Sequence, residues 1–115
     1  MAIPHAKSGE VIEVRPLGPT LATTQTSTLV KTLTLEVIRL ILLPGKEVCH
    51  QHAMAGEVLI QCLEGWITFT ARGTTRELRA GQMLVLAAGE PHSLVGLEDS
   101  SVLVTKVLPG SPTAP

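Results

Sequence analysis

The sequence predicts an all-β domain, either a sandwich or a barrel. Short runs rich in β-branched and aliphatic residues recur along the chain, and glycine or proline turn signals separate them. No segment shows a convincing helical period. The chain has 115 residues, enough for one modest hydrophobic core but not for two. We therefore expect a single domain over residues 1–115, with its core at about 10–108 and flexible ends at 1–9 and 109–115.

The expected elements follow from these runs in chain order. Glu10–Arg15 is the first aliphatic run, and Thr20–Ser27 has room for one helical turn. Leu29–Leu42 is long enough for two strands or one bent strand, and the Pro44-Gly45 turn signal follows it. The later predicted strands, with the turn signal after each where there is one, are Glu47–His52, Val58–Leu63 (Glu64-Gly65), Trp66–Ala71 (Arg72-Gly73), Thr75–Leu78 (Ala80-Gly81), Met83–Ala87 (Ala88-Gly89), His92–Val95 and Ser101–Val107 (Pro109-Gly110).

Composition narrows the classes of partner. Trp66 and Phe69 are the only aromatic residues, so the core must be built from aliphatic side chains. A net charge of -1 provides no field that attracts nucleic acid or an anionic membrane, and neither is an expected partner. The start of the chain has no secretory pattern, and no window is apolar enough to span a membrane. We therefore expect a cytoplasmic protein.

Three of the four histidines suggest a metal site. His50 and His52 are two residues apart in an extended stretch, so their side chains share one face of a strand. With the carboxylate of Glu57 and a third imidazole at His92, they supply the nitrogen and oxygen ligands that divalent metals bind. Cys49 should point to the opposite face, which disfavours a Cys/His zinc site.

The spacing of these residues is similar to the two sequence motifs of the cupin family. Gly45, His50, His52, Glu57 and Gly65 resemble the first motif, and Gly81, Gly89 and His92 resemble the second. The resemblance implies a double-stranded β-helix, or jelly-roll barrel, of the small single-domain RmlC-like type. It also implies a divalent transition metal (Fe, Mn, Ni or Zn) held inside the barrel by the three histidines and Glu57.

The chain departs from the motifs at positions that are not metal ligands. Four residues separate Gly45 from His50, where the motif has five. Ala87 stands at the motif's proline, Gly96 at its asparagine, and Gln82 where an aspartate often follows the glycine.

Glu57 is the least secure of the proposed ligands. It is correctly spaced from His52, but seven residues rather than six separate it from Gly65. Counting back from Gly65 turns Val58 inward and Glu57 outward, unless a bulge after Gly56 reverses the faces. In that register the pocket wall is formed by Val58, Ile60 and Cys62. The sequence favours a site of three histidines completed by water, with Glu57 as an occasional or outer partner.

Several functions remain compatible with this site. A metal with open positions would suit a dioxygenase-like or isomerase-like enzyme acting on a small organic substrate, and apolar or aromatic carbonyl compounds fit the apolar inward residues. A non-catalytic cupin that binds or senses a metal or small ligand is the alternative, and a vestigial site in a structural dimer is a third. Charge is sparse along Leu29–Leu42, so we expect a homodimer that buries one sheet face there.

Overall fold

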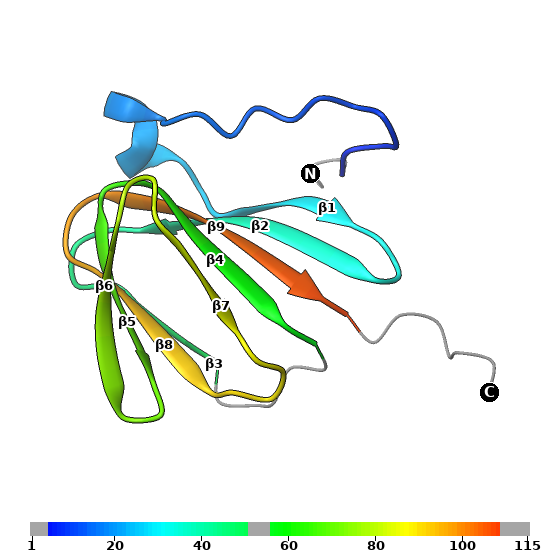
Figure 1. The fold of residues 1–115 in the computed structure, drawn as a ribbon. Helices are drawn as coiled ribbons and strands as arrows, with labels where there is room; N and C mark the ends of the chain where they lie inside the picture. The colour runs from blue at the N-terminus through cyan, green and yellow to red at the C-terminus, as the bar shows by residue number, and fades with distance from the viewer. Residues whose placement is uncertain (1–4, 51–55, 109–115) are drawn as a thin grey trace, which may run out of the picture.

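The computed structural model describes residues 5–50, with only the backbone of His50, and residues 56–108. These ranges contain one 3-10 helix and nine strands (Figure 1). In chain order the elements are η1 (Gly18–Thr23), β1 (Ser27–Lys31), β2 (Leu35–Leu42), β3 (Glu47–His50), β4 (Val58–Glu64), β5 (Trp66–Ala71), β6 (Thr74–Arg79), β7 (Met83–Leu86), β8 (His92–Gly96) and β9 (Ser100–Val107).

The strands form two antiparallel sheets, which confirms the predicted all-β class. The five-stranded sheet has the order β1-β2-β9-β4-β7, and the four-stranded sheet has the order β3-β8-β5-β6. Strands β1 and β2 form a hairpin from the long run Leu29–Leu42, which the sequence had left as two strands or one. Strand β9 lies between β2 and β4, so the end of the described chain ties together segments from its first and second halves. No helix in the described ranges is long and apolar enough to cross a membrane.

The expected strand at Glu10–Arg15 is wrong. The structure has no regular element there, and Val11 is 86% exposed. The Val11 side chain packs against no buried surface, so burial of this side chain does not stabilise pairing of the segment with a sheet edge. The expected helical turn exists but begins earlier, as η1, and it is anchored by Leu21, which is buried.

The core lies between the two sheets. Aliphatic side chains dominate it, as the scarcity of aromatic residues predicts, and Phe69 is the one aromatic among the buried residues of the described chain. Alternate residues of each strand point inward, which is the period that half-buried strands require. The buried cluster consists of Leu42, Val58, Ile60, Cys62, Ile67, Phe69, Leu78, Leu86, Leu94, Val102 and Val104.

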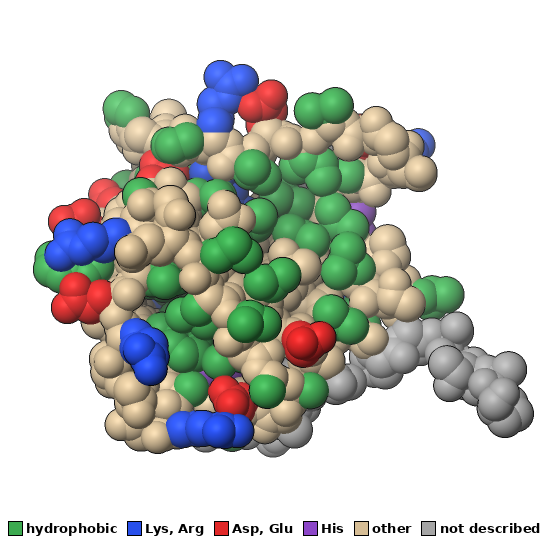
Figure 2. Space-filling model, in the orientation of Figure 1, with side chains coloured by type: hydrophobic (Ala, Val, Ile, Leu, Met, Phe, Trp, Pro, Cys, Tyr) green, Lys and Arg blue, Asp and Glu red, His purple; other side chains and the backbone are tan. Residues whose placement is uncertain are grey.

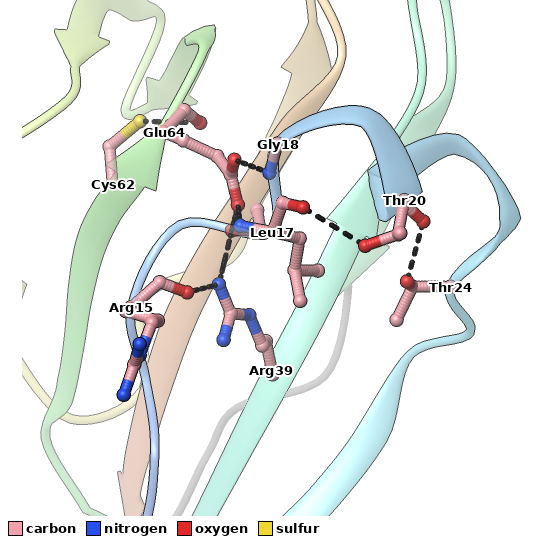
Figure 3. Close-up of polar contacts among 9 residues, drawn as sticks. Arg15, Leu17, Gly18, Thr20, Thr24, Arg39, Cys62 and Glu64 are labelled. Atoms are coloured by element: carbon pink, nitrogen blue, oxygen red, sulfur yellow. Dashed lines mark hydrogen bonds and ion pairs between the residues drawn. The ribbon is translucent and has the colours of Figure 1, made fainter.

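A partly buried ion pair fastens the segment before η1 to the outer face of the five-stranded sheet (Figure 3). Arg39 on β2 and Glu64 at the end of β4 approach to 3.3 Å. The Arg39 guanidinium also donates to the carbonyl oxygen of Arg15. The Glu64 carboxylate accepts hydrogen bonds from the backbone amides of Leu17 at 2.7 Å and Gly18 at 3.1 Å. These contacts anchor the N-terminal segment, and the charges of Arg39 and Glu64 offset each other.

The same contacts set the acidity of Glu64. Burial alone would raise the pKa of its carboxyl. The hydrogen bonds from Leu17, Ser101 and Gly18, together with the charge of Arg39, outweigh burial and hold the pKa below its usual value. The ionised form is therefore the one that the fold stabilises.

Candidate metal site

Strands β3 and β8 bring two of the three predicted histidine ligands to one point of the four-stranded sheet. In the β3–β8 ladder the backbone of His50 lies directly opposite that of His92. Residues directly opposite in an antiparallel pair share a face of the sheet. The side chain of His50 and all of His52 lie outside the described residues.

His92 is 5% exposed and lies on the inner face of β8, two residues before the buried Leu94. Its Nδ1 is 3.1 Å from the carbonyl oxygen of Glu90. A carbonyl oxygen can only accept, so Nδ1 carries a proton in this hydrogen bond. Metal-binding histidines are commonly oriented in this way, with one ring nitrogen bonded to a backbone carbonyl.

Glu57 lies on the outer side of the five-stranded sheet. Its side chain is exposed, and it borders a small cavity of about 130 Å³ with Leu59, Val85 and Val107. The next residue, Val58, is buried, as the register counted from Gly65 predicts. The irregularity in β4 falls between Cys62 and Glu64 rather than after Gly56. Ligation by Glu57 stays a prediction, and this position makes it depend on a local rearrangement.

The predicted wall residues Val58, Ile60 and Cys62 all point into the interior between the sheets. They are 2%, 0% and 0% exposed. The Cys62 thiol lies 3.5 Å from the carbonyl oxygen of Glu64, and burial raises its pKa. The thiol therefore stays protonated at neutral pH and contributes packing rather than reactivity.

The described residues contain no group of three or more histidine, cysteine, aspartate or glutamate side chains that could hold a metal ion. Two of the expected ligands are at positions 50 and 52, whose side chains are not described. The fit of a metal therefore depends on His92, whose burial, inward direction and fixed tautomer suit a ligand.

A groove beside this site was not predicted from the sequence. It opens between β6 and β7, the edge strands of the two sheets, and has a volume of about 260 Å³. Its apolar wall is formed by Phe69, Leu84 and Leu86, and Arg76 and the Arg72–Glu90 ion pair border it. The sequence contained one indication of this groove. Leu78 is apolar and expected inside, and Arg76, two residues earlier in the same strand, must lie on the same face.

Comparison with known proteins identifies the fold. No protein-family model and no curated protein matches the sequence. A cupin superfamily protein from Desulfitobacterium hafniense matches the structure with a TM-score of 0.72 and 17% identity, over 90% of this chain and 99% of that one. An RmlC-like cupin from Desulfovibrio desulfuricans matches with a TM-score of 0.66 and 24% identity, over 90% and 97%. The chain has the cupin fold.

The expected jelly roll is thereby confirmed. A structure of a conserved protein of unknown function is similar as well. That protein, a conserved one from Streptococcus pyogenes, matches with a TM-score of 0.71 and 24% identity over 96% of this chain and 97% of its own.

The cupin structure explains one departure from the motifs. A Cβ atom on Gly96 would lie 2.7 Å from the carbonyl oxygen of Leu43. The backbone of Gly96 also exchanges hydrogen bonds with the turn after β2, accepting from Gly45 and donating to Lys46. No side chain fits there, so the asparagine of the motif would require this turn to move away.

Proposed function

We propose that this protein is a metal-binding cupin in which His50, His52 and His92 hold one divalent transition metal inside the barrel. Water would complete the coordination. Glu57 would be an occasional or outer partner of the site and not one of its regular ligands. When bound, the metal would supply a Lewis acid for an oxygen-bearing organic molecule. His92 would bind through Nε2, since its Nδ1 is engaged by the Glu90 carbonyl.

The single observation that carries this proposal is the position of His92. The imidazole is buried on the inner face of β8, opposite the backbone of His50, and a carbonyl fixes its tautomer. The ring also stacks on Phe69, which holds its orientation. Burial, the carbonyl contact and the stacking together restrict the ring to one orientation, and preorganisation of this kind favours binding.

The decisive experiment compares metal content in matched histidine variants. Wild type, His92→Ala and His5→Ala would be purified without an affinity tag or chelator, stripped, and titrated with Mn, Fe, Ni and Zn. His5 is exposed on the N-terminal segment, so its loss controls for removal of an imidazole in general. We expect wild type and His5→Ala to bind one ion per chain and His92→Ala to lose at least tenfold in affinity. Equal affinity in all three would refute the site.

We further propose a dioxygenase-like or isomerase-like activity on a small organic substrate, with binding without turnover as the alternative. Oxygen consumption by the metal-loaded protein with candidate substrates separates the two. Tight binding of a compound without oxygen uptake or isomerisation would identify a binding protein.

We also propose a homodimer, through a surface different from the one expected. On the outer face of β2, Arg39 and Ile41 are already buried, at 7% and 4% exposure. Four of the seven exposed large apolar side chains of the described residues lie instead over β4, β7 and β9, where Figure 2 shows hydrophobic groups gathered. They are Leu59, Met83, Val85 and Val107, which are 39%, 56%, 61% and 42% exposed. A second copy of the chain would cover this patch in a twofold arrangement.

A further inference from the structure

Arg76 is the one arginine that has no acidic partner within residues 5–50 and 56–108. Among the described residues the other four arginines each pair with a glutamate, as Arg15–Glu13, Arg39–Glu64, Arg72–Glu90 and Arg79–Glu77. No described residue forms an ion pair with Arg76. Its charge is therefore available to a ligand.

The direction of Arg76 makes that charge part of the groove between β6 and β7. In the β5–β6 ladder Arg76 lies opposite Phe69, and Leu78, two residues further along β6, is buried in the core. Arg76 therefore lies on the same face of β6 as Leu78, and its exposed side chain borders the groove. Arg79 lies on the opposite face and stacks on Trp66, with its guanidinium carbon 4.1 Å from the ring centroid. In the lower left of Figure 2, hydrophobic side chains lie recessed between basic and acidic ones in this region.

The charges that face the groove leave it positive. Glu90 borders the groove, but its carboxylate is bound by Arg72 at 2.9 Å. Arg76 therefore adds a positive charge that no acidic side chain of the described groove compensates. Arg76 is exposed at the edge of the groove, where its guanidinium can form charge-assisted hydrogen bonds with a carboxylate. The apolar walls beside it reduce solvent screening on one side of such a pair.

We propose that this groove binds a small organic acid. Its carboxylate pairs with the guanidinium of Arg76, and its apolar part packs against Phe69, Leu84 and Leu86. The volume of about 260 Å³ suits a small molecule, since pockets for larger ligands start at roughly 300 Å³. Arginine is suited to this role because its planar fork can donate two parallel hydrogen bonds to one carboxylate.

The same acid is a candidate substrate of the metal site, and that part rests on the proposed function. Phe69 forms a wall of the groove and stacks on His92, with ring centroids 5.9 Å apart. A molecule held by Arg76 therefore has its apolar end close to the inner face of β8. Binding of the acid itself requires only the groove and does not depend on a metal.

The test uses benzoate and its neutral analogue benzamide. Each is titrated into the full-length protein, metal-free and zinc-loaded, by calorimetry and by NMR of the methyl groups of Leu84 and Leu86. Wild type is compared with Arg76→Gln, Arg76→Lys and Arg79→Gln. The last variant is the matched control, because it removes the same charge from the opposite face of the same strand.

We expect saturable benzoate binding in metal-free wild type, with shifts at both leucines and benzamide at least about tenfold weaker. Arg76→Gln should weaken benzoate by about tenfold or more, Arg76→Lys should retain part of the affinity, and Arg79→Gln should match wild type. No saturable binding of benzoate, or equal affinity in wild type and Arg76→Gln, would overturn the inference.

The metal state separates this inference from the proposed function. In one outcome, benzoate binds only the zinc-loaded protein, and its binding is lost in His92→Ala but kept in Arg76→Gln. Benzoate would then be a metal ligand, the groove proposal would be wrong, and the metal site would be supported. In the other outcome, benzoate binds the metal-free protein through Arg76 and the protein takes up no metal. The groove proposal would then be supported and the proposed metal site would be wrong.

Discussion

The ring of Phe69 packs against the ring of His92, with centroids 5.9 Å apart and planes inclined at 29°. Phe69 also lies opposite Arg76 in the β5–β6 ladder and forms a wall of the groove there. One buried side chain therefore separates the proposed metal ligand from the proposed carboxylate site. His92 and Arg76 are on β8 and β6, the two strands that flank β5, so each can be replaced without removing the other.

Glu57→Gln tests whether the outward carboxylate takes part in metal binding. Because Glu57 is exposed on the outer side of β4, we expect the substitution to leave manganese affinity within about twofold and stability within about 0.5 kcal/mol. Titration of apo wild type and variant in identical buffer provides the measurement. A loss of tenfold or more would mean that the chain turns Glu57 inward on binding metal.

Val85→Glu tests the proposed dimer surface. Val85 is 61% exposed in the apolar patch, opposite Leu59 of β4, and a charge buried there against a second copy would oppose association. We expect a dimer for wild type and a monomer for the variant by light scattering at micromolar concentration. Leu33→Glu is the control, since Leu33 is 74% exposed in the β1–β2 turn and its replacement should leave the dimer intact. A monomeric wild type would dismiss the patch as an interface.

Glu64→Gln tests the ion pair that holds the N-terminal segment. Loss of the carboxylate leaves Arg39 buried without its counter-charge, and we expect a loss of roughly 1–3 kcal/mol in the free energy of unfolding. Glu13→Gln, which removes an exposed partner of Arg15, should cost less than about 0.5 kcal/mol. Urea denaturation at pH 7 measures both, and similar losses in the two variants would contradict a special role for Glu64.

The lowered pKa of Glu64 predicts a pH dependence with a definite sign. A carboxyl whose pKa is lower in the folded state than in the unfolded chain stabilises the fold at pH values above the ordinary value of 4.5. That stabilisation is lost as the pH falls through the folded-state pKa. The difference in stability between wild type and Glu64→Gln should therefore shrink on acidification from pH 6 toward pH 3. A difference that stays constant over this range would show that ionisation of Glu64 contributes nothing.

Gly65→Ala tests the tight turn between β4 and β5. Gly65 has a φ of 92°, and a Cβ there would collide with the backbone and side chain of Ser100 and with the carbonyl of Asp99. Gly73 has a comparable φ of 73°, but nothing lies within 4 Å of its Cβ position. We expect Gly73→Ala to cost about 1 kcal/mol from backbone strain alone and Gly65→Ala to cost more than about 2 kcal/mol. Thermal unfolding compares the pair, and equal losses would show that close packing at Gly65 is unimportant.

The sequence by itself determined most of the strands and the kind of fold. The run from Trp66 to Ala71 lies between Gly65 and the Arg72-Gly73 turn, and the predicted strand coincides with β5. Local chemistry suffices here, because β-branched and aliphatic residues favour extended backbone and glycines allow the turns between strands. The motif spacing likewise predicted the cupin fold and picked out His92, whose inward side depends only on alternation along β8.

Only the tertiary structure decided what depends on distant neighbours. Glu10–Arg15 has a strand-like sequence but pairs with no strand of the described chain. Arg39 becomes buried because Glu64 and the N-terminal segment cover it. Arg76 faces a groove because the edges of two sheets, β6 and β7, come together there. These outcomes follow from which surfaces the folded chain brings into contact, and residue order along a single strand does not encode them.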